Sequence, residues 1–210
     1  MPQTEFLAAL KSATAGTLPL TALVGAAGRL SEAGQHDLAE QLYKVWIGLN
    51  PTDPHVFVAQ FNASGLLTQS GDLQGSAAML EAAIAANADF LPAYVNLGGI
   101  YERLNQPERG VALWAEAAAR PISPTGANVG YVIAALKQTG RLLGENQRLA
   151  GAEAALRQCL DLRADQRDVA EQFVAMRLAQ CIWPVVQPWD GVDRRTLMQG
   201  IHPLLSLIHI

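Results

Sequence analysis

The feature of this sequence that most constrains its fold is an internal repeat. Windows that begin at Phe57 and Leu91 lie 34 residues apart, and an earlier window begins at Leu20, 37 residues before Phe57. The extra residues of the first window come from region 53–55. A repeat of this length cannot bury its apolar residues alone, so successive units must pack against one another. The sequence therefore predicts a stack of similar units.

Equivalent positions of the three windows carry residues of similar size. The eighth position is small, the eleventh is large and apolar, the twentieth is small and the twenty-fourth is bulky. In window order these residues are Ala27, Ser64 and Gly98; Leu30, Leu67 and Tyr101; Ala39, Ser76 and Gly110; and Tyr43, Leu80 and Trp114. Small residues let two antiparallel helices approach closely, and bulky residues fill the groove between hairpins.

Turn-forming residues divide each window into two helices. The fifteenth position is Gly34, Gly71 or Asn105, and these residue types tolerate the left-handed backbone that ends a helix. A proline that directly follows Asp53, and another that follows Gln106, mark the first turn of a helix. Each window is therefore predicted to be a helix, a short turn and a second helix.

The third window carries Tyr94-x-x-Leu97-Gly98-x-x-Tyr101, then Gly110-x-x-x-Trp114-x-x-Ala117, with Pro121 behind. This pattern resembles the tetratricopeptide repeat. The first two windows depart from it, because Gln60 and Ala63 replace the aromatic residue and the leucine, and Trp46 stands where alanine is expected. The resemblance implies an all-α solenoid of helical hairpins, and the departures leave the packing of the first hairpin open.

The predicted organisation is a capping helix, a run of repeats and a C-terminal linker helix. The expected boundaries are 1–19 for the capping helix, 20–56, 57–90 and 91–124 for three repeats, 125–165 for an expanded fourth repeat, 166–204 for the linker helix with a Cys-x-Trp segment, and 205–210 for a non-native tail. In the fourth repeat the first helix is expected to end at Gly140. Its partner is expected to run from about Glu145 to Leu162.

The residues after Asp165 no longer follow the repeat. A helix is expected over 168–179, and Pro184, after Cys181-x-Trp183, must interrupt it. This order resembles bacterial SPINDLY-type protein O-linked N-acetylglucosamine transferases. The resemblance implies the substrate-recognition arm of a glycosyltransferase, truncated before a catalytic domain of alternating strands and helices. A free-standing tetratricopeptide adaptor for protein–protein interaction stays open as the alternative.

Two asparagines are the candidate binding residues. Asn62 and Asn96 both occupy the sixth position of their windows, which faces the concave side of the superhelix in this repeat class. The glycosyltransferase resemblance implies an asparagine ladder whose amides grip the backbone of a bound peptide, because an amide both donates and accepts hydrogen bonds. Gly25 and Tyr131 fill the nearest equivalent positions of the outer windows, so the ladder has two rungs. The expected partner is a protein or an extended peptide.

No catalytic residue, cofactor or metal ligand is predicted, because the sequence lacks a nucleophile with an acid–base pair, a phosphate loop and metal spacing. The resembled family has a functional histidine near the position of His202. No acid, base or nucleophile stands near it in sequence, so we interpret it as non-catalytic. Trp46, Trp114 and Trp183 have helical spacing and are interpreted as core residues rather than as ligand platforms.

Composition narrows the class of partner and the compartment. The net charge of −4, without a cluster of basic residues, argues against nucleic acid. No apolar stretch approaches the roughly 18 residues that span a bilayer, and Glu5 precedes the first lysine, so no secretory signal is expected. Cys159 and Cys181 are interpreted as reduced, buried thiols of a cytoplasmic protein, with a disulfide or metal site as the alternative. Oligomeric state stays open.

Overall fold

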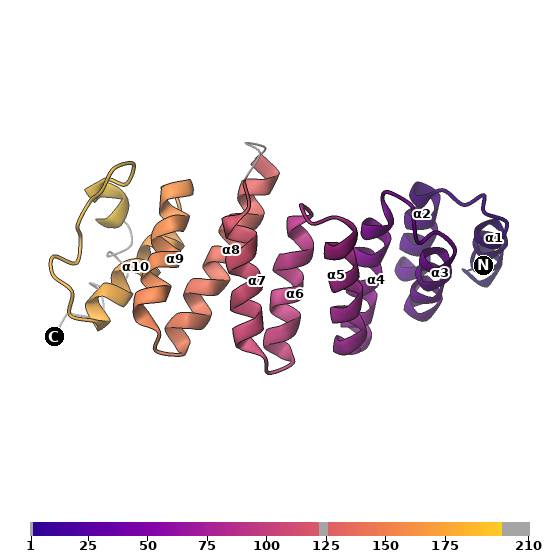
Figure 1. The fold of residues 1–210 in the computed structure, drawn as a ribbon, viewed down its shortest axis with the longest axis horizontal. Helices are drawn as coiled ribbons and strands as arrows, with labels where there is room; N and C mark the ends of the chain where they lie inside the picture. Colours follow the sequence, from indigo (N-terminus) through magenta and orange to yellow (C-terminus); the bar gives the residue numbers. More distant parts are fainter. Residues whose placement is uncertain (1, 122–125, 199–210) are drawn as a thin grey trace. The chain divides into compact units, whose positions relative to one another are not determined.

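The structure is a computed structural model that describes residues 2–121 and 126–198. Within them it forms the helices α1 to α10 (Figure 1). No strand pairs into a sheet in these ranges, where the sole β-type contact is an isolated bridge between Trp189 and Val192. The predicted all-α helical-repeat fold is confirmed. None of the described helices is long and apolar enough to cross a membrane. His202 and the tail 205–210 lie outside the described residues.

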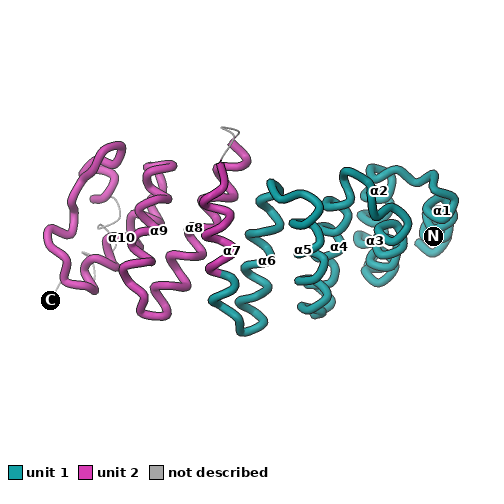
Figure 2. Tube along the Cα trace, viewed as in Figure 1, with its two compact units in different colours: residues 1–110 teal, residues 111–210 magenta. Residues whose placement is uncertain are grey.

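The chain forms two compact units, residues 1–110 and 111–210, and the boundary falls within α7 (Figure 2). Unit 1 contains six helices and the start of a seventh: α1 Pro2–Thr14, α2 Leu20–Glu32, α3 His36–Leu49, α4 Val56–Ser70, α5 Leu73–Ala86, α6 Leu91–Arg103 and α7 Pro107–Ala119. In this unit α2 pairs with α3 and α4 with α5, while α1 packs against both α2 and α3. Each pair is joined by a short turn, so its two helices run in opposite directions.

The residues at the eighth, eleventh, twentieth and twenty-fourth positions of the three windows are all buried, as predicted. The tightest backbone approach in unit 1 involves two of the small positions. A Cβ atom built on Gly110 would lie 2.7 Å from the carbonyl oxygen of Gly98, a distance at which atoms overlap. Glycine is therefore required at the twentieth position of the third window.

The second window solves the same packing problem with polar residues. Ser64 and Ser76 occupy its two small positions and are 2% and 0% exposed. The Ser64 hydroxyl donates to the Phe61 carbonyl at 2.6 Å. The Ser76 hydroxyl lies 2.8 Å from the hydroxyl of Thr68, which also donates to the Ser64 carbonyl at 2.8 Å. Because buried hydroxyls that find partners cost little, these hydrogen bonds let serine replace alanine or glycine at the helix contact.

Trp46 explains why the first window departs from the repeat pattern. Its side chain is 2% exposed, and its indole N–H donates to the carbonyl oxygen of Leu18 at 2.8 Å. Leu18 lies in the connection between α1 and α2. An alanine could not reach this carbonyl. The tryptophan therefore links the segment that leads into α2 to the partner helix, α3. The prediction that Trp46 and Trp114 are core residues is confirmed, since Trp114 is 1% exposed.

The predicted left-handed turn residues have positive φ angles. These angles are 74° at Gly34, 89° at Gly71 and 59° at Asn105. After Gly34 and after Asn105, the next backbone N–H donates at 2.8 Å to a carbonyl five residues earlier, which closes the end of the helix.

One predicted helix start is correct and another is displaced. α7 begins at Pro107, directly after Gln106, as expected. α4 begins at Val56, beyond the expected start at Asp53. The Asp53 carboxylate accepts a hydrogen bond from the backbone N–H of His55 at 2.8 Å and forms a turn ahead of the helix.

In unit 2, α8 spans Gly126–Glu145 and α9 spans Leu149–Leu162. The expectation that the first of these helices ends at Gly140 is wrong. A Cβ atom on Gly140 would lie 2.8 Å from Cδ2 of Leu156, so this glycine makes room for a neighbouring side chain inside a continuous helix. The additional residues of the expanded hairpin therefore lengthen its first helix.

The predicted helix at 168–179 is α10, Arg167–Ala179. The segment after it is held by Arg177, which is 9% exposed. Its guanidinium donates to the carbonyls of Pro184 and Val185, both at 3.1 Å, and pairs with Glu153 of α9 at 2.6 Å. The interpretation of Trp183 as a core residue is wrong, since it is 75% exposed. Val185 fills the buried position instead.

Candidate binding surface

The two candidate asparagines lie on first helices of unit 1. Asn96 on α6 is exposed, and Asn62 on α4 is half-buried. Burial raises the pKa of the Tyr43 hydroxyl, and a hydrogen bond from the Asn62 side chain lowers it in part. This bond orients the Asn62 amide from α3 while leaving hydrogen-bonding capacity unused, because an amide offers two N–H donors and one oxygen.

A row of glycines, which sequence analysis missed, accompanies the asparagines. The ninth position is Gly28, Gly65 and Gly99 in the three windows. A Cβ atom built on any of them would meet nothing within 4 Å, so helix packing does not require these glycines. Each one destabilises its helix by roughly 0.5–1 kcal/mol relative to alanine. Because these glycines have no side chain, each leaves open space at the ninth position of its window, on the surface of the first helix.

Three partly exposed aromatic rings meet between α4 and the start of α6. We call Phe57, Phe61 and Phe90 the phenylalanine cluster. The Phe90 ring centroid lies 4.9 Å from that of Phe57 and 5.2 Å from that of Phe61, and the second pair is edge-to-face. All three residues are half-buried. Sequence analysis did not find the cluster, because Phe90 closes one window while Phe57 and Phe61 lie at the start of the same window.

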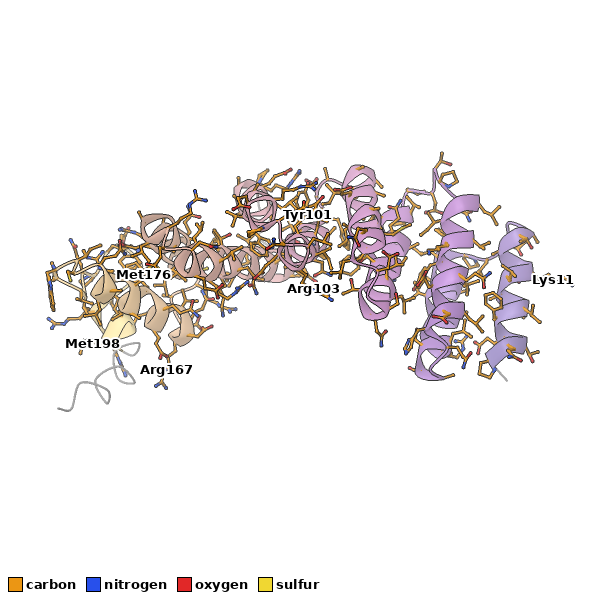
Figure 3. All side chains as sticks on the ribbon, turned by 90° about the horizontal axis from the view of Figure 1, so that it is seen from below. Lys11, Tyr101, Arg103, Arg167, Met176 and Met198 are labelled. Carbon is orange, nitrogen blue, oxygen red and sulfur yellow. The ribbon has the colours of Figure 1, made fainter. Side chains whose placement is uncertain are left out.

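The exposed Asp89 directly precedes Phe90, but the helix that carries the other two rings is uncharged. Helix α4 contains no charged residue in its 15 positions. The charged residue of α5, Glu81, is engaged by α6 and α7: it accepts a hydrogen bond from the Tyr101 hydroxyl and pairs with Arg109 at 3.4 Å. Burial is the largest cause of the raised pKa of Tyr101, and Glu81 raises it further. Tyr101 is labelled in Figure 3, and the Arg109 guanidinium lies 3.7 Å from its ring centroid.

Unit 2 contains a separate recess of about 400 Å³ between α8 and α10. Gly140, Gly144 and Met176 contribute to its apolar wall, and a Cβ atom on Gly144 would come within 3.1 Å of the Met176 methyl group. Figure 3 labels Met176 on α10. The ion pair between Arg141 and Glu145, at 3.0 Å, lies at the edge of the recess.

The described residues hold no group of three or more His, Cys, Asp or Glu side chains that could bind a metal. Both cysteines are unpaired thiols. Burial raises the pKa of Cys159 to about 12, while Lys137 lowers it and Asp168 raises it. The expectation of two buried thiols is wrong for Cys181, which is exposed at a backbone φ of 55°. The break in the helix before Pro184 turns it outward.

Comparison with known proteins supports the fold. No family model and no curated protein matches the sequence. Solved structures do match. MamA from Desulfovibrio magneticus RS-1 has 13% identity over 89% of this chain and 93% of its own, with a TM-score of 0.60. BtubC from P. vanneervenii has 13% identity over 100% and 93%, with a TM-score of 0.64.

YrrB, described as a TPR protein with an unusual peptide-binding site, has 15% identity over 96% of each chain and a TM-score of 0.60. Identities this low carry the fold and not the activity. The chain is therefore similar, over nearly its whole length, to tetratricopeptide-repeat proteins, and its helical hairpins have the tetratricopeptide type of fold.

Proposed function

We propose that this chain is a protein-binding scaffold that holds an extended peptide segment of its partner across the first helices of unit 1. The observation that carries the proposal is the repetition on α4 and α6: an asparagine at the sixth position is followed three residues later by a glycine with open space above it. The glycine lets a foreign backbone come close, and the amide matches a peptide group whatever its side chain.

The spacing of the asparagines is compatible with an extended peptide. Helix α5 packs against both α4 and α6, so the asparagine-bearing helices lie somewhat farther apart than the roughly 8–10 Å of neighbouring helices. An extended chain advances about 3.3–3.6 Å per residue. Asn62 and Asn96 would therefore meet peptide groups about three or four residues apart. YrrB, with the same fold, is described as having a peptide-binding site, which makes this use of the fold plausible here.

The test is a double substitution. Asn62→Ala combined with Asn96→Ala should weaken binding of a selected peptide about ten- to thirty-fold, because each lost hydrogen bond contributes on the order of 1 kcal/mol. The circular dichroism spectrum should stay that of a helical protein. Gln74→Ala removes an exposed amide from α5 and serves as the matched control. Equal affinity of the double variant and the parent would contradict the proposal.

The resemblance to SPINDLY-type transferases adds a more specific version, in which this scaffold is the substrate-recognition arm of a protein O-glycosyltransferase. One observation favours it: the Cys-x-Trp segment forms its own structure, fixed by Arg177, and does not continue the repeats. A gene that continues into alternating strands and helices would support this version. A gene without them would leave the free-standing adaptor. The chain alone is expected not to turn over a sugar nucleotide, which an assay of the purified protein checks.

A cytoplasmic location is part of the proposal. Its support is the exposed, unpaired thiol of Cys181 together with the unpaired Cys159, which suit a reducing compartment.

A further inference from the structure

The phenylalanine cluster is the part of unit 1 that the repeat itself does not require. The small and large core positions of the second window are filled by Ser64, Leu67, Ser76 and Leu80, all of which are buried. The rings of the cluster are additional to this core and remain half-exposed. Such rings offer both a face and an edge to another aromatic side chain.

The cluster lies on the same two elements as the proposed peptide-binding residues, α4 and the start of α6. Phe61 directly precedes Asn62 on α4, and its ring meets Phe90 edge-to-face at 5.2 Å. Phe90 occupies the N-cap position of α6, the helix that carries Asn96. A peptide held by both asparagines would therefore run past the cluster. One of its side chains would lie close enough to reach the rings.

The absence of charge along α4 restricts the ligand further. Helix α4 has no charged side chain, although 16% of the chain's residues are charged. On α5, Glu81 is already held by Tyr101 and Arg109. A charged ligand residue placed along α4 would lose water without gaining a partner of opposite sign, which is unfavourable. An uncharged segment has no such loss.

We infer that unit 1 selects uncharged segments of a partner protein that carry an aromatic side chain, which packs on the phenylalanine cluster while Asn62 and Asn96 hold the backbone. This inference rests on the proposed peptide-binding function and adds its side-chain specificity. Sequence-independent amide contacts fix where the peptide lies, and the cluster decides which peptides remain bound.

The experiment is a selection from a random peptide library displayed on phage, with the full chain as the bait. Enriched peptides are expected to carry a Phe, Tyr or Trp within a stretch free of Asp, Glu, Lys and Arg. One enriched peptide is then synthesised with a fluorescent label and titrated by anisotropy. Replacing its aromatic residue by alanine should weaken binding at least ten-fold, since a central aromatic anchor dominates such interfaces.

Substitutions in the protein complete the test. Phe61→Ser should weaken binding of the selected peptide about ten-fold or more, and Phe61→Leu, which keeps an apolar side chain beside Phe90, should weaken it less. Leu49→Ser, at a site in unit 1 that is 51% exposed and outside the cluster, should leave affinity unchanged. Unchanged helix content and melting temperature in Phe61→Leu ensure that its affinity reports on the surface and not on folding.

The outcomes separate this inference from the function beneath it. If no peptide is enriched, both are overturned. If enriched peptides are charged, or if they depend on Asn62 and Asn96 but bind Phe61→Ser normally, the aromatic specificity is wrong and the peptide-binding function stands. If sedimentation shows a homodimer that Phe61→Ser dissociates, the cluster is covered by a second copy and the inference is also wrong.

Discussion

Unit 1 and unit 2 both place glycine where two helices of a hairpin meet, but for different reasons. In unit 1, Gly110 faces the backbone of Gly98, and an added Cβ would meet the carbonyl oxygen at 2.7 Å. In unit 2, Gly140 faces Leu156, a side chain with rotatable bonds, at a comparable 2.8 Å. A backbone carbonyl inside a helix cannot move aside, whereas a leucine can change rotamer. The same residue type therefore marks a strict requirement in one unit and a tolerant one in the other.

The two units also differ in how an arginine is used: it is exposed in unit 1 and buried in unit 2. Arg109 of unit 1 lies over Tyr101 with a side chain that is 57% exposed. Arg177 of unit 2 has a side chain that is 11% exposed and binds one carboxylate and two backbone carbonyls. Regular repeats hold together by packing, and their charges stay in water. The segment that leaves the repeat in unit 2 depends on a buried charge.

The largest effect is expected from removing the buried arginine. Arg177→Met should lower the free energy of unfolding by about 3–5 kcal/mol, because Glu153 loses its partner and two carbonyls lose their donors. Arg109→Met should lower it by less than about 1 kcal/mol, as for other exposed pairs. Urea denaturation measures both. Faster hydrogen exchange over residues 181–192 in Arg177→Met alone would locate the damage, and equal losses in the two variants would refute the contrast.

The helix contacts of unit 1 could largely be predicted from the sequence, whereas few of those in unit 2 could. The 34-residue spacing identifies the small and bulky positions, because each repeat meets its neighbours in the same way. Gly140 was misread, since a glycine that ends a helix and a glycine that admits a neighbouring leucine look alike in one dimension. The role of Arg177 was missed, because its partners are backbone carbonyls that no residue pattern records.

The candidate surface shows the same limit. Asn62 and Asn96 were found because they repeat, and their binding role stays a prediction. The row of glycines at the ninth position also repeats and could have been found in the same alignment. Phe90 could not, because its contact with Phe61 joins the end of one window to its beginning. Trp183 was misassigned because a buried tryptophan is the commoner case for an apolar ring.

The glycine contrast is next in size. Gly110→Ala should destabilise the protein by about 1–3 kcal/mol, because the helices must separate. Gly140→Ala should cost about 1 kcal/mol or less, since Leu156 adjusts and alanine favours the helix. Gly99→Ala and Gly130→Ala, where an added Cβ meets nothing within 4 Å, are the matched controls and should be neutral or stabilising. A Gly140 variant as damaged as the Gly110 variant would show that Leu156 is fixed.

The hairpin turns provide a smaller test. Asn105 and Gln147 both have a φ of 59°, at equivalent turns of the two units. Asparagine tolerates this conformation better than glutamine does. Gln147→Gly should therefore raise the free energy of unfolding by about 0.5–1 kcal/mol, and Asn105→Gly should raise it by less. Thermal unfolding checks the order, which would be reversed if the Gln147 side chain made a stabilising contact.

The smallest effect concerns pH and an exposed ion pair of unit 2. A hydrogen bond from Lys137 of α8 to Asp168 of α10 is the main cause of the lowered pKa of Asp168. Since the folded pKa lies below the unfolded value of about 3.9, the pair stabilises the folded state above pH 4 and loses this contribution as pH falls through the folded pKa.

The Asp168 side chain is 58% exposed, so solvent screens the pair. Asp168→Asn should therefore cost less than about 1 kcal/mol at pH 7. The difference from the parent should disappear as the parent's own carboxyl becomes protonated. Urea denaturation across this pH range is the measurement. Glu81→Gln, which removes a carboxyl group from unit 1, is the control and should retain the acid dependence of the Lys137–Asp168 pair. A gap between parent and Asp168→Asn that stays constant down to pH 2 would mean that the substitution acts through packing and not through charge.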